Sequence, residues 1–300
     1  MSEARNLTPS TQHSALITLT TDFGLTDNFV GVMKGVIAGI APAARVIDLS
    51  HVVPPQDVRA GAFVLATGFE VFPPGTIHLA IVDPGVGSAR RAIALAAGGY
   101  RWVAPDNGLL GYALAALAAA GRLGGRWNDG WWVLDDSAQA VELAEPRYWR
   151  PAVSRTFHGR DVFAPVAAHL AAGVPLDALG PRLDRVQALA LLRPEWGEGG
   201  WRGEVIYVDN FGNLLTSLTV RELGDADWQI VVEGPAGRGG GGRAAGGAAT
   251  IAGLSASYAA MPRLGAILGS SGHLEIAVPN GSAAKRLGAG VGWVVRARPR

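Results

Sequence analysis

Short apolar runs that alternate with helix-patterned segments constrain the fold of this 300-residue chain more than any other feature. The runs predict buried strands, and apolar residues spaced three or four positions apart predict helices. The predicted strands cover residues 15–21, 44–49, 76–81, 91–96 and 101–104, and the predicted helices cover 27–40, 56–70 and 109–120. Strands separated by helices at this spacing are typical of βαβ units. The sequence therefore predicts an α/β fold with a mostly parallel, Rossmann-like domain over residues 15–175.

The pattern changes towards the carboxyl terminus. Residues 176–200 hold proline, charged residues and glycine, a composition typical of a linker. From residue 201 onward the apolar runs are short and separated by turn residues, which predicts a small β-barrel domain over 201–298. Within that domain the glycine-rich tract Gly234–Gly247 is expected to be a mobile hairpin loop, and residues 1–14 are expected to be a disordered leader.

The composition excludes several classes of function. The formal net charge is +1, from 26 basic and 25 acidic residues, so no overall field favours nucleic acid or an anionic membrane as a partner. The absence of cysteine excludes disulfides, thiolate catalysis and cysteine-bound zinc. The sequence begins without a signal-peptide pattern and contains no run of 18 apolar residues, so a soluble, cytoplasmic protein is expected.

An acid and a base lie on either side of a turn in the segment Val82–Arg90, directly after a predicted buried strand. Open α/β sheets place their chemistry at the carboxyl ends of strands, which makes Asp83 and Arg90 candidate catalytic residues. An arginine beside a carboxylate orients it and lowers its pKa. A purely structural ion pair across the turn explains the same two residues equally well. A phosphate-binding loop is disfavoured because the segment lacks the Lys-Ser/Thr ending.

Two more polar positions are candidates. His158 lies in the polar run Thr156–Asp161 rather than on an apolar face, which favours a functional histidine. No second histidine stands close enough to complete a metal site, so no metal is expected. Asp22 follows the first predicted strand, where a carboxylate can accept hydrogen bonds from a ribose diol. Alternatively, Asp22 or, more readily, Asp27 caps the helix that follows.

Four further polar segments combine turn-forming residues. Taken alone, each segment is explained by a turn at least as well as by a ligand-binding role. Within them, the amide of Asn213 offers a donor and an acceptor that can match a base edge. The segments are Pro105–Gly108, Asp209–Asn213, Ser270–Gly272 and Asn280–Ser282.

Seven segments in the same order, between residues 15 and 297, resemble the S-adenosyl-L-methionine (SAM) hydroxide adenosyltransferases, or SAM hydrolases, which are relatives of the SAM-dependent fluorinase and chlorinase. Seven motifs in register are far more specific than any one of them. The segments are Thr20–Asp27, Asp48–Asp57 (DLSHVVPPQD), Val82–Arg90 (VDPGVGSAR), Pro105–Leu110 (PDNGLL), Thr156–Asp161 (TFHGRD), Asp209–Asn213 (DNFGN) and Gly272–Ser282 (GHLEIAVPNGS).

The resemblance implies an amino-terminal α/β domain, a carboxy-terminal β-barrel and hydrolysis of SAM to adenosine and L-methionine without a cofactor or metal. It also implies a homotrimer in which each SAM lies between domains of neighbouring subunits. The family's catalytic residues fall on Asp83, Arg90 and His158. Its substrate-binding positions fall on Asp22 for the ribose, Asn213 for adenine, Tyr258 for stacking, Asp209 and Ser270 for the methionine moiety, and Phe211.

Two other functions remain as alternatives. A SAM-dependent halogenase is disfavoured, because Asp83 and Gly159 stand where the fluorinase has a tyrosine and a serine, and a carboxylate repels halide. The fluorinase's inserted loop is also missing after Arg90. A non-catalytic SAM or adenosine sensor would keep Asp22 and Asn213 but would not need the three catalytic candidates together.

Overall fold

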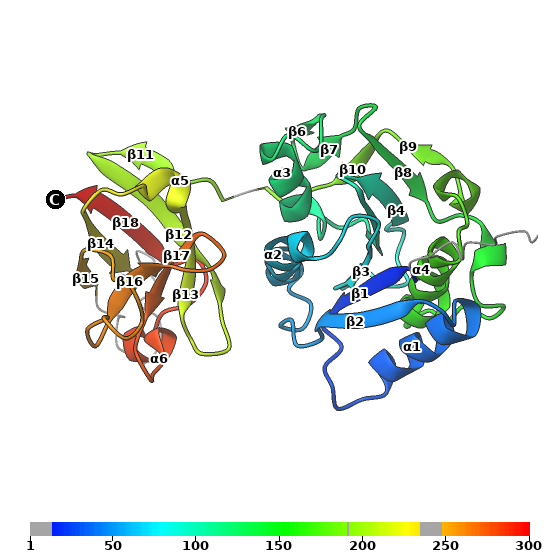
Figure 1. Cartoon of the computed structure of the whole chain (residues 1–300), viewed down its shortest axis with the longest axis horizontal. Coiled ribbons are helices and arrows are strands. Elements are labelled where there is room, and N and C mark those ends of the chain that lie inside the picture. The colour runs from blue at the N-terminus through cyan, green and yellow to red at the C-terminus, as the bar shows by residue number, and fades with distance from the viewer. Residues whose placement is uncertain (1–13, 191, 235–247) are drawn as a thin grey trace, which may run out of the picture. The chain divides into compact units, whose positions relative to one another are not determined.

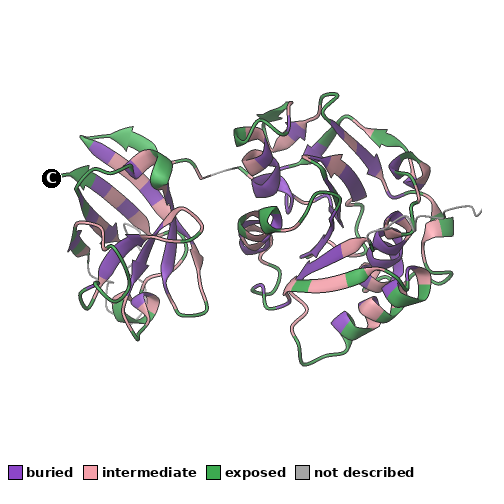
Figure 2. Cartoon of the chain, viewed as in Figure 1, coloured by how far each residue is buried: buried purple, intermediate pink, exposed green. Residues whose placement is uncertain are grey.

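The computed structural model describes residues 14–190, 192–234 and 248–300. The expected leader, apart from Ser14, and the expected hairpin loop, apart from Gly234, lie outside the described residues. The chain divides into two compact units, one up to residue 190 and one from residue 191. Each unit has its own buried core, coloured purple in Figure 2.

A seven-stranded sheet forms the centre of the amino-terminal unit, in the order β2-β1-β3-β5-β4-β8-β9 (Figure 1). The first four strands in this order are parallel and the others pair antiparallel. The prediction of an α/β domain with a mostly parallel sheet is therefore confirmed. The strands are β1 (Leu16–Thr21), β2 (Arg45–Ser50), β3 (Ile77–Ile81), β4 (Ala92–Ala97), β5 (Tyr100–Pro105), β8 (Ala138–Glu142) and β9 (Arg182–Leu183).

Helices cover the sheet in two groups: α1 packs against α4, and α2 packs against α3 (Figure 1). Helix α4 continues a π-helical turn, η3, which begins one residue after His158. The bounds are α1 (Phe29–Ile40), α2 (Val58–Gly68), α3 (Gly111–Ala119), η3 (Gly159–Phe163) and α4 (Ala164–Ala171), with short 3₁₀ turns η1 (Phe69–Val71), η2 (Pro146–Tyr148) and η4 (Leu176–Leu179).

The strand order creates a topological switch point between β1 and β3. The chain leaves β1 for β2 on one side and then returns to β3 on the other. Ligands of open α/β sheets bind outside the carboxyl ends of the strands at such a point. In the register of the two strands Thr21 pairs with Ile81, so Asp22 and Asp83 follow neighbouring strand ends.

The boundary between the units, after residue 190, falls within the expected linker, 176–200, but part of that stretch is built into the amino-terminal unit. Residues 176–190 belong to the amino-terminal unit, where β9 pairs with β8 and β10 (Arg185–Gln187) joins a small sheet with β7 (Trp131–Val133) and β6 (Arg126–Asn128). These strands have two or three residues each, too few to show a period in the sequence. That brevity, together with proline and charge, explains why the region resembles a linker.

An antiparallel, nearly closed sheet forms the carboxy-terminal unit, in the order β15-β14-β18-β12-β13-β17-β16 with β11 paired to β12 (Figure 1). Its edge strands β15 and β16 contact each other, which confirms the predicted barrel-like domain. The elements are β11 (Glu195–Gly197), β12 (Gly200–Val208), β13 (Leu214–Thr219), α5 (Val220–Leu223), β14 (Trp228–Glu233), β15 (Ala249–Ala252), β16 (Gly265–Leu268), β17 (His273–Ala277), α6 (Ala283–Leu287) and β18 (Val294–Pro299).

Within the described ranges, no helix combines the length and the apolar character that crossing a bilayer requires.

Strand β1, which pairs with β2 on one side and β3 on the other, should contribute strongly to the stability of the amino-terminal unit. Leu19 is fully buried, so we expect Leu19→Ala to lower the free energy of unfolding by about 2–5 kcal/mol through lost burial and the cavity that remains. Urea denaturation measures the change. Val71→Ala is the control, because Val71 is 82% exposed and should change stability little. A Leu19→Ala protein as stable as the control would contradict this account of the core.

Candidate functional site

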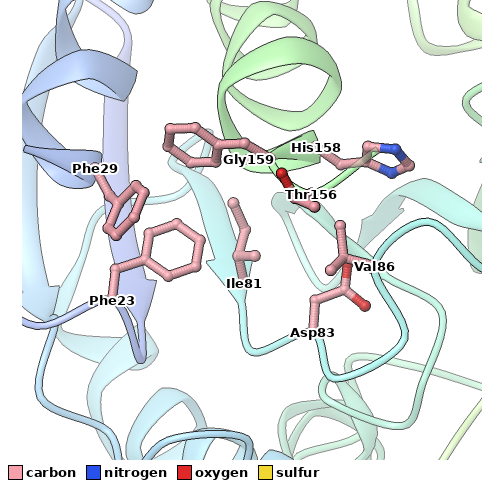
Figure 3. Close-up of a pocket in the computed structure, with 9 residues that line it drawn as sticks. Phe23, Phe29, Ile81, Asp83, Val86, Thr156, His158 and Gly159 are labelled. Carbon is pink, nitrogen blue, oxygen red and sulfur yellow. The ribbon is translucent and has the colours of Figure 1, made fainter. Parts of the chain in front are cut away.

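A cavity of about 120 Å³ opens at the carboxyl ends of β1 and β3. Figure 3 shows Phe23 and Phe29 on one side of this cavity, and Asp83, Val86 and His158 on the other. The lining comes from the end of β3 and the loop after it, from the segment between β1 and the start of α1, and from the segment that enters η3. The lining residues are Phe23, Phe29, Ile81, Asp83, Val86, Thr156, Phe157, His158 and Gly159.

Asp83 and Arg90 form the ion pair that their spacing allows. Arg90 Nε lies 2.9 Å from each carboxylate oxygen of Asp83, and Arg90 Nη2 also contacts Oδ2. The Asp83 side chain is only 5% exposed and that of Arg90 11%. Removing one partner of such a pair leaves a charge with little water to stabilise it. The carboxylate at the end of β3 is therefore held in one orientation by a cation from the same turn.

A glycine in this turn allows it to approach the segment that carries the histidine. Gly87 has φ +78°, and a Cβ atom there would lie 2.5 Å from the carbonyl oxygen of Arg155. A side chain at position 87 would therefore meet both backbone strain and a collision. The close approach brings Arg90 within reach of His158.

His158 is placed by a buried carboxylate one turn further along the chain. Asp161 is fully buried, accepts a hydrogen bond from the backbone N–H of Ser154 at 2.8 Å and pairs with Arg160 and Arg150. Burial raises the pKa of Asp161, but these hydrogen bonds and charges outweigh burial and lower it. Asp161 thus fastens the segment before His158 to the start of η3.

Arg90 joins the acid to the histidine. Its Nη2 lies 3.1 Å from His158 Nδ1. A guanidinium can only donate, so Nδ1 accepts and the neutral ring carries its hydrogen on Nε2. Burial lowers the pKa of His158, and the positive charge of Arg90 lowers it further. The three predicted catalytic residues therefore form one contiguous cluster, Asp83–Arg90–His158, with a neutral imidazole at one end.

The turn after β5 supports the same loop from behind. Asn107 Nδ2 donates to the carbonyl oxygen of Val82 at 2.8 Å, directly before Asp83. Its neighbour Asp106 is buried, pairs with Arg91 and accepts from the backbone N–H of Gln187 at 2.6 Å. The Pro105–Gly108 segment is thus a structural turn that also fixes the backbone beside Asp83.

An aromatic cluster forms the apolar wall of the cavity, and the sequence analysis missed it. Phe29 and Phe157 pack edge to face with centroids 5.1 Å apart, and Phe23 packs against both. Two of the three directly adjoin predicted site residues, Phe23 after Asp22 and Phe157 before His158. Their position next to predicted site residues is the signal from which the sequence could have indicated this aromatic wall. The cluster gives the cavity an apolar wall opposite its charged side.

Asp22 accepts a hydrogen bond at Oδ2 from the backbone N–H of Gln56, at 2.7 Å. It does not cap α1, and neither does Asp27. The residue at the amino-terminal cap is Asn28, whose side chain makes no capping hydrogen bond. The capping interpretation of these aspartates is therefore wrong, and the carboxylate of Asp22 stays at the carboxyl edge of the sheet beside β3.

In the carboxy-terminal unit, Asp209 and Asn213 bind each other across the β12–β13 hairpin. Asp209 Oδ2 accepts from Asn213 Nδ2 at 2.8 Å, and Oδ1 accepts from the backbone N–H groups of Phe211 and Asn213. Asn213 is buried, whereas the Phe211 ring at the tip is 74% exposed. The predicted turn exists, and it presents three of the predicted substrate-binding side chains together.

Tyr258 is half-exposed, and its hydroxyl donates to Glu275 of β17. Burial and this carboxylate raise the pKa of Tyr258 to about 12, so the phenol stays neutral. Glu275 is a buried acid that the sequence analysis did not single out. Ser270 lies exposed in the turn between β16 and β17. Among the described residues, no group of three acidic or histidine side chains has the geometry of a metal site.

Two family models and two hydrolases similar to this chain have related descriptions. The family model for the SAM hydroxide adenosyltransferase N-terminal domain matches residues 17–180, and that for the C-terminal domain matches residues 203–296. An (R)-S-adenosyl-L-methionine hydrolase of Thermus thermophilus is 41% identical, over 92% of this chain and 96% of its own length. A hydrolase of the same name from Salinispora arenicola is 49% identical, over 68% of this chain and 72% of its own.

Two further likenesses are more distant. A fluorinase of Actinoplanes sp. is 28% identical over 69% of this chain and 73% of its own length. The crystal structure of an uncharacterized conserved protein from Thermotoga maritima aligns with a TM-score of 0.76 and 33% identity, over 94% of this chain and 99% of its own.

The pKa of His158 should lie below the ordinary 6.5 and should rise in an Arg90→Ala variant. The substitution removes a neighbouring positive charge and leaves the Asp83 carboxylate unpaired, and both changes favour the imidazolium. NMR titration of the ring signals measures this, with a His158→Gln variant to assign the resonance. Arg91→Ala is the control, because Arg91 pairs with Asp106 instead. An unchanged or lower pKa in Arg90→Ala would contradict the arrangement.

Proposed function

Because the chain belongs to the SAM hydroxide adenosyltransferase family, we propose that it hydrolyses SAM to adenosine and L-methionine, and that Asp83, Arg90 and His158 carry the chemistry. The observation that supports these roles is the contiguous cluster of the three side chains at a cavity with an aromatic wall. We also propose that the substrate is the (R) form, which the names of the hydrolase relatives specify.

The proposed step is an in-line displacement at the ribose. A water oxygen forms a bond to C5′ while the C5′–S bond breaks and its electron pair returns to sulfur. The sulfonium thereby becomes the neutral thioether of methionine, and one proton leaves the water. The protein must align one water molecule with the C5′–S bond and exclude the others. A small cavity with Asp83 and His158 on one side and aromatic rings on the other suits that task.

The hydrogen-bond directions support separate roles for the acid and the histidine. Since His158 accepts at Nδ1 from Arg90, its Nε2 carries the hydrogen and can donate to the water oxygen. The ionised carboxylate of Asp83 can only accept hydrogen bonds, whereas Nε2 of His158 already carries a hydrogen. Asp83 is therefore the group that takes the proton lost by the water. Protonation of His158 places a second hydrogen against Arg90, so activity should fall as the pH drops through the lowered pKa of His158.

The substrate-binding roles follow the family positions. We propose that Asp22 binds the ribose hydroxyls, Asn213 reads adenine with Tyr258 stacked on it, and Asp209 and Ser270 meet the methionine moiety, with Phe211 also in contact. The Asp209–Asn213 hydrogen bond and the hydroxyl anchor on Tyr258 support them, because preset side chains lose less entropy on binding. We propose that no cofactor or metal takes part, since SAM already carries its own leaving group.

We also propose a homotrimer, acting in the cytoplasm, in which the amino-terminal unit of one subunit and the carboxy-terminal unit of its neighbour share each SAM molecule. The support is the distribution of the proposed contacts: Asp22 and Asp83 belong to one unit, and Asn213 and Ser270 to the other. A closed ring of heterologous contacts would satisfy every site.

The products test the reaction directly. Purified protein in ¹⁸O-labelled water should convert (R)-SAM to methionine and to adenosine labelled at its 5′ oxygen, and a chelator such as EDTA should not slow it. Liquid chromatography with mass spectrometry identifies both products. Halogenated adenosine in the presence of chloride or fluoride, without labelled adenosine, would favour a halogenase. Bound but unconverted SAM would favour a sensor.

Alanine variants should separate catalysis from binding. Asp83→Ala, Arg90→Ala and His158→Ala should each lower kcat by about 100- to 10,000-fold, the range for positioned proton-transfer groups. Asp22→Ala and Asn213→Ala should mainly raise KM, because their proposed partners on SAM do not react. Steady-state kinetics on all five variants makes the comparison. Near-normal turnover by His158→Ala would mean that the histidine is structural.

Mixed oligomers should reveal whether sites are shared between subunits. When Asp83→Ala and Asn213→Ala chains are co-assembled in equal amounts, about a quarter of the shared sites should draw both units from intact sequence, because pairing around a ring is random. Measured at SAM concentrations well below the raised KM of Asn213→Ala, activity should then exceed that of either variant alone. A protein that is monomeric in analytical ultracentrifugation and fully active, with no rescue on mixing, would refute the shared site.

A further inference from the structure

A buried histidine that the proposed reaction does not use lies beneath the carboxyl edge of β1. His51 is 3% exposed and follows the end of β2. Its Nε2 lies 3.0 Å from Asp48 Oδ1, and the other oxygen of Asp48 accepts from Lys34 at 2.7 Å. Its Nδ1 lies 2.9 Å from the hydroxyl of Thr21, the last residue of β1. The histidine thus connects a surface ion pair to the strand end that precedes Asp22.

The directions of these hydrogen bonds are mutually consistent. Thr21 Oγ1 accepts from the backbone N–H of Phe23 at 3.2 Å, so its own hydrogen is available for His51 Nδ1. The ring then carries its hydrogen on Nε2, facing the Asp48 carboxylate. The Thr21 side of the ring is therefore hydrogen-bonded, and Asp48 Oδ1 is the acidic oxygen beside Nε2, at 3.0 Å.

The segment that begins with His51 holds the loop after β1 at three points. The first is the side-chain contact from His51 to Thr21. The second is the carbonyl oxygen of His51, which accepts from the backbone N–H of Gly24 at 2.7 Å. The third is the backbone N–H of Gln56, which donates to Asp22 Oδ2 at 2.7 Å. Asp22 and the cavity residue Phe23 both lie between these attachment points.

We propose that His51 is a positioning residue for the substrate ribose, and that it acts through Thr21 and the Thr21–Gly24 backbone to hold the Asp22 carboxylate in its binding orientation. This inference rests on the proposed function, since it assigns the ribose of SAM to Asp22. The proposal assigns a role to the Asp48–Asp57 motif, which takes no part in the proposed reaction chemistry. His51 contacts no reacting atom and acts entirely through other residues.

The same strand supplies a matched control. Thr18 Oγ1 lies 2.7 Å from His78 Nδ1, so β1 carries two buried Thr–His pairs, one inside the sheet and one at the site edge. Thr18→Val and Thr21→Val remove the same hydroxyl from the same kind of pair, with little change of shape. If buried pairs served stability alone, the two variants would behave alike.

Kinetics on SAM separates the two pairs. Thr21→Val should raise KM about tenfold, the factor that 1.4 kcal/mol produces, with a smaller change in kcat. Thr21→Ser, which keeps the hydroxyl, should restore KM, and Thr18→Val should leave it unchanged. His51→Asn, whose side chain can still meet Thr21, is the second variant and should lie between wild type and Thr21→Val. Circular dichroism checks that each variant is folded.

A ribose-specific readout distinguishes positioning from general loosening. Adenosine should inhibit wild type and Thr18→Val much more strongly than 2′,3′-dideoxyadenosine does, because only adenosine offers the diol to Asp22. In Thr21→Val the preference for adenosine over the dideoxy analogue should shrink towards the value in Asp22→Ala. Adding Thr21→Val to an Asp22→Ala protein should change this preference little further, because both substitutions act on the same contact. An undiminished preference in Thr21→Val, or equal KM effects for both threonine variants, would overturn the inference. A wild-type protein that fails to hydrolyse SAM would instead overturn the proposed function on which it rests.

Discussion

The bidentate ion pair between Asp83 and Arg90 is the interaction on which the rest of the site depends. It fixes a carboxylate at the end of β3 with almost no exposure to solvent, and the same guanidinium reaches His158. Arg90 also lies over the ring of Phe163, with Cζ 5.1 Å from its centroid, so a helix of the core holds the cation in place. One arginine therefore sets the orientation of the acid and the tautomer of the histidine, and its charge adds to the lowering of the His158 pKa that burial causes.

The fold brings the three groups together by placing each on a separately fastened segment. Asn107 fixes the backbone before Asp83, Asp161 fastens the segment before His158, and Gly87 allows the two segments to touch. The loop after β1 is fastened in the same way by the segment after β2. Binding sites of open α/β proteins lie beyond the carboxyl ends of the strands. The rigid sheet fixes where each loop begins, and the loops themselves can vary in sequence and carry the functional residues.

Much of this was predictable from the sequence, because the signals were local. The strand–helix alternation, the strand-end positions of Asp22 and Asp83, the Asp83–Arg90 pair and the Asp209–Asn213 turn all lie within short stretches of chain. The buried partners were less visible, because Glu275 gains its role from the hydroxyl of Tyr258 in another segment, and Asp161 gains its role from the way the chain folds back through Ser154 and Arg150. Strands β9 and β10 are too short to show a period, so their residues read as part of the expected linker. The capping role of Asp27 was wrong because the helix begins after Asn28 instead.

The central claim is the proposal that Arg90 and Asp83 act in the reaction as one unit. A double-variant cycle of single-turnover rates tests it most directly, using Asp83→Ala, Arg90→Ala and the double variant with saturating enzyme. Residues that act as one unit are strongly non-additive, so the double variant should lose little more rate than the slower single variant. A double variant whose loss equals the product of the two single losses would show that Arg90 and Asp83 act independently, and would contradict the account.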